Sequence, residues 1–150
     1  MRALIQRCLR ARVTVDERVV GAIGKGYLVF LGVGKTDTEE EARFLATKIL
    51  DLRLFPDGEK ENHLTIREVG GEILVVSQFT LYGDVKKGRR PSFDLAMPGP
   101  EAKRLYEYFV DRLRESGVGV QTGEFGAMME VELVNWGPYT LWIEKELKDV

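Results

Sequence analysis

Two helices, each with one apolar face, are predicted in a chain whose other apolar segments have the pattern of β-strands. The first helix is expected to begin at Thr38, where Glu41 completes a capping box. The second follows Pro98 and Pro100 and is expected to end near Gly117. The apolar stripes at helical spacing are Ala42, Leu45, Ala46, Ile49 and Leu50 in the first helix, and Ala102, Leu105, Tyr106, Phe109, Val110 and Leu113 in the second. Both stripes need an apolar surface to cover, and the strands around them can provide it.

The remaining apolar segments predict strands. Residues 9–15 alternate apolar and polar side chains, as a half-buried strand does, and residues 19–23 form the returning strand. Residues 26–33 and 71–80 are continuous apolar runs of the kind found in buried strands, and Pro56-Asp57-Gly58 predicts a turn. Three further strands are expected at residues 118–122, 128–135 and 139–145. We therefore predict a mixed α/β, α+β-like fold, in which curved, largely antiparallel sheets form a barrel-like core covered by two amphipathic helices.

The composition excludes several classes of protein. The chain has 150 residues, of which 44% are apolar, and this suits a single domain over residues 1–150 with a buried core. A net charge of −2 argues against a protein that coats nucleic acid through a global positive field. A single cysteine, Cys8, no signal-peptide pattern and no apolar run of membrane-spanning length indicate a cytoplasmic protein with no membrane association. The sequence has no His/Cys cluster and no phosphate-binding glycine loop, so we expect no metal and no cofactor.

Uncharged polar residues stand at the end of the strand predicted over residues 71–80. In an extended strand Gln78 and Thr80 share a face and lie about 6.5 Å apart. Backbone N–H groups near Phe79 and Thr80 become free where strand pairing stops. With the Gln78 amide they could form an oxyanion hole, in which each donor lowers the barrier by ~3 to 4 kcal/mol. The alternative, which these local residues alone favour, is a polar strand end that faces water.

A compact basic loop follows this strand end. It contains Lys86-Lys87-Gly88-Arg89-Arg90, and Pro91-Ser92-Phe93 comes directly after it. The glycine and the proline favour a shaped loop that binds phosphate, although an isolated run of charges is usually a solvated loop. If the loop binds nucleic acid, the contact is local and touches two or three phosphates, so its salt dependence is modest.

A Gly-Pro pair interrupts the apolar run of residues 131–143. Pro138 cannot donate to a β-ladder, so the chain is expected to bend or break at this point. Gly137 allows unusual backbone angles, and a cis bond is possible before Pro138. The pair is either a tight turn between two strands or a rigid element that presents carbonyl groups to a ligand.

These segments together resemble the bacterial-type D-aminoacyl-tRNA deacylase family over nearly the whole chain. Two signatures carry most of the resemblance: Ser77-Gln78-Phe79-Thr80, and the Asn-x-Gly-Pro-x-Thr pattern of residues 135–140. The other matching segments are Met1-Arg2-Ala3, Gln6-Arg7, Val13-Thr14-Val15, Gly24, Leu31-Gly32-Val33, Gly70-Gly71-Glu72, Val75-Val76, Leu81-Tyr82, Arg90-Pro91-Ser92-Phe93 and Thr122-Gly123-Glu124-Phe125-Gly126-Ala127. The chain departs from the family at Trp136, where Asp is frequent, at Tyr139, where Val is frequent, and at Asn62-His63, where a Met-Asn pair is common.

The resemblance implies a cofactor-free homodimeric hydrolase that cleaves the ester between a D-amino acid, or glycine mischarged on tRNA-Ala, and the 3′ end of tRNA. The implied catalytic residues are Ser77, Gln78, Phe79 and Thr80. The implied residues of chiral selection are Gly137 and Pro138, which are joined by a cis bond in the family and enter the partner subunit's pocket, and Arg7, which holds them. The expected tRNA-binding residues are Lys86, Lys87, Arg89 and Arg90.

An aminoacyl ester is already an activated acyl group, so it needs orientation and an oxyanion hole rather than a strong protein base. We expect the N–H groups of Phe79 and Thr80, with help from Gln78, to bind the oxyanion while water attacks with assistance from the ribose 2′-hydroxyl. Thr80 as a nucleophile is the second hypothesis, because no general base is visible to activate it. Three rival classes stay open: a non-catalytic module that binds RNA ends, a purely structural dimer, and an amidase or peptidase that uses Thr80.

Overall fold

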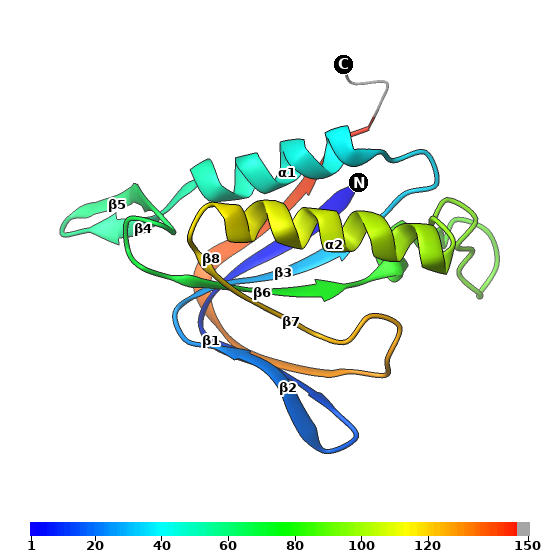
Figure 1. The fold of residues 1–150 in the computed structure, drawn as a ribbon, viewed down its shortest axis with the longest axis horizontal. Coiled ribbons are helices and arrows are strands. Elements are labelled where there is room, and N and C mark those ends of the chain that lie inside the picture. The colour runs from blue at the N-terminus through cyan, green and yellow to red at the C-terminus, as the bar shows by residue number, and fades with distance from the viewer. Residues whose placement is uncertain (147–150) are drawn as a thin grey trace.

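The computed structural model describes residues 1–146 and consists of strands, two long helices and one short 3-10 helix (Figure 1). The strands are β1 (Arg2–Val15), β2 (Arg18–Ile23), β3 (Gly26–Gly32), β4 (Arg53–Asp57), β5 (Lys60–Thr65), β6 (Glu72–Ser77), β7 (Gly119–Thr122) and β8 (Glu130–Glu144). The helices are α1 (Glu39–Asp51), α2 (Gly99–Glu115) and the 3-10 helix η1 (Phe79–Tyr82). Within residues 1–146, no helix is both long enough and apolar enough to cross a membrane.

One curved sheet of six strands organises the molecule. Its order is β2-β1-β3-β6-β7, and β8 pairs with β1. β1 is antiparallel to β2, β3 and β8, whereas β6 is parallel to both β3 and β7. The sheet curls until β2 approaches β7, so a Cβ atom added to Gly21 would lie 2.4 Å from the carbonyl oxygen of Thr122. The predicted fold class is therefore confirmed, including the barrel-like curvature and the largely antiparallel pairing.

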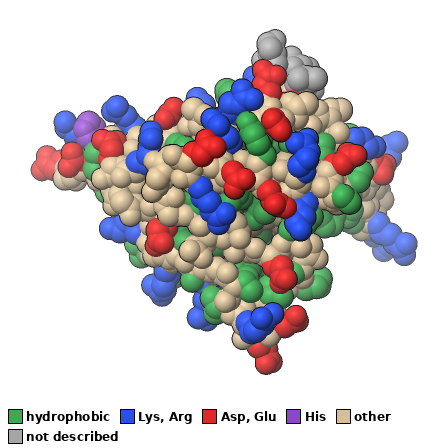
Figure 2. Space-filling model, in the orientation of Figure 1, with side chains coloured by type: hydrophobic (Ala, Val, Ile, Leu, Met, Phe, Trp, Pro, Cys, Tyr) green, Lys and Arg blue, Asp and Glu red, His purple; other side chains and the backbone are tan. Residues whose placement is uncertain are grey.

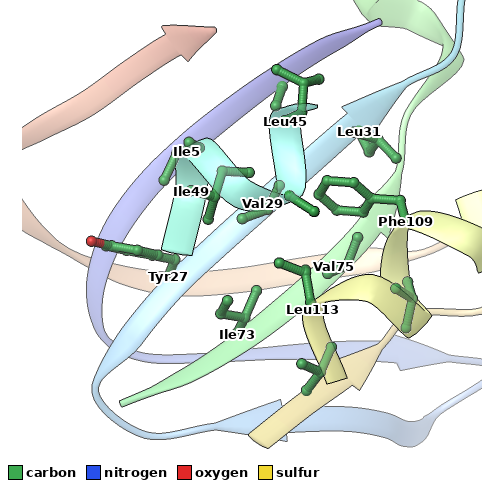
Figure 3. Close-up of a cluster of buried hydrophobic side chains, with 14 of the residues drawn as sticks. Ile5, Tyr27, Val29, Leu31, Leu45, Ile49, Ile73, Val75, Phe109 and Leu113 are labelled. Atoms are coloured by element: carbon green, nitrogen blue, oxygen red, sulfur yellow. The ribbon is translucent and has the colours of Figure 1, made fainter. Parts of the chain in front are cut away.

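The two long helices cover one face of this sheet (Figure 1). The stripes predicted from helical spacing are buried along both helices. Figure 3 shows Leu45 and Ile49 of α1 and Phe109 of α2 converging on Val29 of β3. These side chains are fully buried in the larger of two apolar clusters, so the helices are held by the burial of apolar surface against the sheet.

Several predicted strand boundaries are wrong. The strand expected over residues 71–80 ends at Ser77, because η1 begins at Phe79. The strands expected at residues 128–135 and 139–145 form one strand, β8, which continues through Pro138. A proline is tolerated there because, among the strands of residues 1–146, β8 pairs with β1 alone and so has a free edge. β1 extends seven residues further toward the N-terminus than expected, and the predicted turn at residues 56–58 belongs to an unpredicted hairpin, β4–β5.

Candidate active site

The polar strand end lies where β6 gives way to η1. The Gln78 N–H donates to the carbonyl oxygen of Leu31 at 2.8 Å, which is the last bond from the sheet, and the Leu81 N–H donates to the Gln78 carbonyl at 3.2 Å. Phe79 and Thr80 are therefore the first residues of η1, and the first N–H groups of a helix have no acceptor within it. Two adjacent backbone donors are available at the predicted positions, although a helix start supplies them rather than an unpaired strand.

The side chains of Gln78 and Thr80 also lie together, for a different reason than expected. They do not share the face of an extended strand, because Thr80 is inside η1. The Gln78 side-chain amide instead donates a hydrogen bond to the Thr80 hydroxyl across the first turn of η1. This bond holds the Gln78 amide against the Thr80 side chain at the start of η1.

A pocket of about 680 Å³ opens at this point. Ser77, Gln78 and Phe79 lie on one side of it, while Thr80 is absent from its lining. Its lining also includes the first residues of α2 and the segment 125–129, which precedes β8. The pocket therefore combines an apolar interior with polar groups gathered at the end of β6, as sites for small ligands usually do.

Aromatic and methionine side chains form much of this pocket, and of these the sequence singled out only Phe79 as a site residue. Phe79 and Phe93 meet edge to face with their ring centroids 5.1 Å apart, and Phe125 also lines the pocket. Met128 is 93% exposed and Phe79 is 55% exposed, so the pocket mouth presents apolar surface to solvent. Phe93 and Phe125 lie in segments that match the family, and that match is the only sequence signal for this wall.

The basic loop (residues 86–90) leaves the same end of the sheet. Reciprocal backbone hydrogen bonds of 2.8 Å between Asp84 and Ser92 close its base. Gly88 has φ +70°, a conformation that favours glycine. The loop's four cationic side chains are exposed, and Figure 2 shows Lys and Arg side chains at the edge of the molecule formed by the loops between η1 and α2. The rest of this face carries mixed charge, as the net charge predicts.

The Gly137–Pro138 peptide bond is cis, and Arg7 holds the segment in place. The Arg7 guanidinium donates to the carbonyl oxygens of Trp136 at 3.0 Å and Gly137 at 2.8 Å, and to that of Leu54 on β4. Arg7 is only 5% exposed, and burial lowers its pKa from the usual value. Its charge is therefore satisfied by backbone carbonyls rather than by a carboxylate, and one of these carbonyls belongs to the Gly-Pro pair.

The Gly-Pro pair lies far from the pocket of its own chain. Gly137 is beside Arg7 on β1, which pairs with Tyr27 of β3, and Tyr27 in turn pairs with Ile73, four residues before Ser77 on β6. Strands lie about 4.8 Å apart and rise about 3.3 Å per residue, so three strand spacings and four residues separate the two by roughly 20 Å. One chain alone does not bring the two signatures together.

Comparison with known proteins identifies the family. The sequence model of a protein family described as D-Tyr-tRNA(Tyr) deacylase matches residues 4–144. The chain belongs to this deacylase family. The D-aminoacyl-tRNA deacylase of Cyanothece sp. is 54% identical over 97% of this chain and 93% of its own length. That of Aquifex aeolicus is 56% identical over 96% of this chain and 97% of its own.

Two solved structures have a fold similar to that of this chain. One is titled c-Myc DNA Unwinding Element Binding Protein; it is 41% identical, covers 97% of this chain and 99% of its own, and superimposes with a TM-score of 0.91. The other is described as a probable eukaryotic D-amino acid tRNA deacylase; it is 20% identical and covers 96% of this chain and 98% of its own. Its TM-score of 0.85 shows that the two proteins share a fold. The assignment to a family of hydrolases that act on the ester of aminoacyl-tRNA is thus confirmed.

Proposed function

We propose that this enzyme hydrolyses the ester between a D-amino acid and the 3′-terminal ribose of tRNA, and also releases glycine mischarged on tRNA-Ala. The observation that carries the proposal is the pocket at the end of β6, which Gln78 and Phe79 line and where the first residues of η1 leave two backbone N–H groups without an acceptor inside the helix. This arrangement supplies donors for an oxyanion but no titratable base. An activated ester is a substrate that such a site can hydrolyse.

The terminal adenosine of the tRNA fits the remainder of the pocket. Its volume of about 680 Å³ is in the range of small-ligand sites, and Phe79, Phe93 and Phe125 offer flat apolar faces on which a base can stack. A base held there brings the 3′-ester to the end of β6. The basic loop (residues 86–90) leaves the same edge, and its side chains can contact two or three phosphates of the acceptor end.

Hydrolysis then needs only orientation and charge stabilisation. Water adds to the ester carbonyl carbon, and the N–H groups of Phe79 and Thr80 hold the oxyanion that forms, with the Gln78 amide beside them. The adjacent ribose 2′-hydroxyl relays the proton of the water to the departing 3′-oxygen. The acyl carbon–oxygen bond breaks and leaves a free amino acid and tRNA. The Thr80 hydroxyl accepts a hydrogen bond from the Gln78 side chain and does not act as the nucleophile.

Rejection of L-amino acids comes from a second copy of the chain. Because Gly137 lies roughly 20 Å across the sheet from the pocket of its own chain, a homodimer in which each subunit inserts its Gly-Pro pair into the other pocket is the arrangement that unites them. The carbonyls of Gly137 and Pro138 would anchor the α-amino group, so a D side chain points outward and an L side chain meets backbone. Such a dimer also covers the exposed apolar side chains of Phe79 and Met128 at the pocket mouth. Aminoacyl-tRNA is charged and used in the cytoplasm, so we infer that the enzyme acts there.

The proposal is tested with D-Tyr-tRNA, L-Tyr-tRNA and Gly-tRNA-Ala under single-turnover conditions. We expect release of D-tyrosine and of glycine, with L-Tyr-tRNA left intact at the same enzyme concentration. A non-catalytic RNA-binding module or a purely structural dimer releases none of the three, and a peptidase cleaves a reporter peptide instead. Light scattering of the same sample should give the mass of two chains, and a monomer that is active and stereoselective would contradict the cross-subunit step.

A further inference from the structure

Three positions at which the chain departs from the family pattern are connected in space. Asn62 lies on β5, whereas Trp136 and Tyr139 flank the Gly-Pro pair on β8. The Tyr139 hydroxyl donates a hydrogen bond to the side-chain oxygen of Asn62. The Trp136 ring meets Phe55 of β4 edge to face, with a centroid separation of 6.0 Å. The β4–β5 hairpin therefore contacts both neighbours of the Gly-Pro pair.

Arg7 joins the same contacts into one cluster. Its guanidinium carbon lies 4.0 Å from the centroid of the Trp136 ring and 4.7 Å from that of Tyr139. The same guanidinium bonds the Gly137 carbonyl on β8 and the Leu54 carbonyl on β4. A shift of the hairpin would move one of these acceptors relative to the other, so the hairpin position and the Gly137 carbonyl are coupled through a single rigid group.

The sheet itself leaves the Gly-Pro pair weakly fixed. The β1–β8 pairing shifts register between Gln6 and Cys8, which is where Gly137 and Pro138 lie opposite β1. A Cβ atom added to Gly137 would meet only the Asn135 side chain, at 3.8 Å, so packing does not confine this residue either. Regular ladder bonds cannot orient the two carbonyls at such a break, and the flanking side chains must do so.

We propose that the β4–β5 hairpin is a strut that sets the orientation of the Gly137–Pro138 carbonyls, and that Asn62, Trp136 and Tyr139 are positioning residues for D-over-L selectivity. This inference rests on the proposed role of the Gly-Pro pair in excluding L-amino acids. The hairpin is a separate two-stranded sheet, and such a unit is marginal without tertiary contacts. Its bond to Tyr139 and its contact with Trp136 therefore restrain the hairpin and the Gly-Pro pair together.

The experiment compares kcat/KM for D-Tyr-tRNA and L-Tyr-tRNA in Tyr139→Phe, Asn62→Ala and the double variant. Loss of one hydrogen bond is expected to lower the D-over-L ratio about five- to tenfold in each single variant, chiefly through faster hydrolysis of the L-substrate. The double variant should show no further loss, because both changes remove the same bond. Asn62→Asp keeps an acceptor oxygen and should restore selectivity, which a merely structural defect would not allow.

Two further variants make the outcome unambiguous. Tyr108→Phe removes a hydroxyl that accepts a hydrogen bond from Arg43 on the outer helices, and it should leave the ratio unchanged. Pro138→Ala tests the exclusion step itself. If Pro138→Ala admits the L-substrate while Tyr139→Phe and Asn62→Ala keep full selectivity and the wild-type midpoint of thermal unfolding, the strut is refuted. If Pro138→Ala also keeps full selectivity, the exclusion step on which the strut depends is refuted as well.

Discussion

Replacement of Thr80 by alanine separates the two mechanisms that the site could support. In the proposed mechanism the oxyanion donors are the backbone N–H groups of Phe79 and Thr80, and Thr80→Ala leaves both in place at the start of η1. The variant loses only the hydroxyl that accepts from Gln78. A single net hydrogen bond contributes about 0.5–1.5 kcal/mol. Because about 1.4 kcal/mol corresponds to a factor of ten in rate, turnover should fall by about tenfold or less.

A nucleophilic Thr80 predicts a much larger loss. Removal of the nucleophile from a covalent mechanism costs about 10⁶-fold in kcat in a well-studied serine protease. The expected losses of turnover differ by several orders of magnitude. An error of a few kcal/mol in either estimate would therefore not make the two mechanisms indistinguishable.

The assay is single-turnover hydrolysis of radiolabelled D-Tyr-tRNA with enzyme in excess, followed by intact mass measurement of acid-quenched wild-type protein. Thr14→Ala on β1 is the matched control for loss of a threonine hydroxyl away from the pocket. A loss of more than a thousandfold in Thr80→Ala with Thr14→Ala unaffected, or an acyl adduct on Thr80, would refute the water mechanism.

Three other predictions concern stability, reactivity and tRNA contact. Gly26→Ala should lower the free energy of unfolding by about 1–3 kcal/mol or more, because its Cβ would lie 1.7 Å from the Glu72 carbonyl oxygen. Gly24→Ala, whose Cβ would lie 3.8 Å from the Glu72 carboxylate, should change the free energy of unfolding little. Equal urea midpoints for Gly26→Ala and Gly24→Ala would contradict the predicted difference. Cys8 is buried, and burial raises the pKa of its thiol to about 11, so at pH 8 a disulfide reagent should react roughly 100-fold more slowly than with unfolded protein. Replacing the four cations of the basic loop (residues 86–90) with glutamine should raise KM for tRNA and reduce the slope of log KM against log salt by about 2, and an unchanged slope would remove the loop from the interface.

Local patterns made the helices predictable. The Thr38 hydroxyl accepts from the Glu40 N–H at 3.2 Å and donates to Glu41 at 2.5 Å, so the capping signal in the sequence corresponds to real contacts. Both apolar stripes are buried because periodicity and packing agree. Such features depend on neighbours three or four residues apart, which a sequence displays directly.

Features that depend on distant partners were not predictable in the same way. The β4–β5 hairpin has mostly exposed side chains and no apolar alternation to mark it, and it is fixed by contacts with Arg7 and Tyr139. The continuity of β8 through Pro138 depends on its place at the sheet edge, which only the topology defines. The pocket wall at residues 125–129 approaches Ser77 only through the parallel pairing of β6 with β7.

The candidate site falls between these cases. The sequence placed Gln78, Phe79 and Thr80 together at the end of a strand, and the structure brings them together through η1 instead. It also connected Arg7 with the Gly-Pro pair only through the family resemblance, since the two lie about 130 residues apart in the chain. No local pattern could show that one guanidinium bonds carbonyls on both β4 and β8.

The central claim is that each subunit inserts its Gly-Pro pair into the pocket of the other. Heterodimers of two differently substituted subunits test this claim most directly. One subunit carries Pro138→Ala; the other carries Phe79→Pro, which removes one of the two proposed oxyanion-binding N–H groups together with the Phe79 ring, so that its own pocket loses about 100- to 1000-fold in turnover. In the purified heterodimer the active pocket then receives an intact Gly-Pro pair from its partner. We predict that this heterodimer hydrolyses D-Tyr-tRNA and rejects L-Tyr-tRNA, whereas the Pro138→Ala homodimer hydrolyses both. A heterodimer that releases L-tyrosine as fast, per active pocket, as that homodimer would show that each pocket is guarded by its own chain, and the account would be wrong.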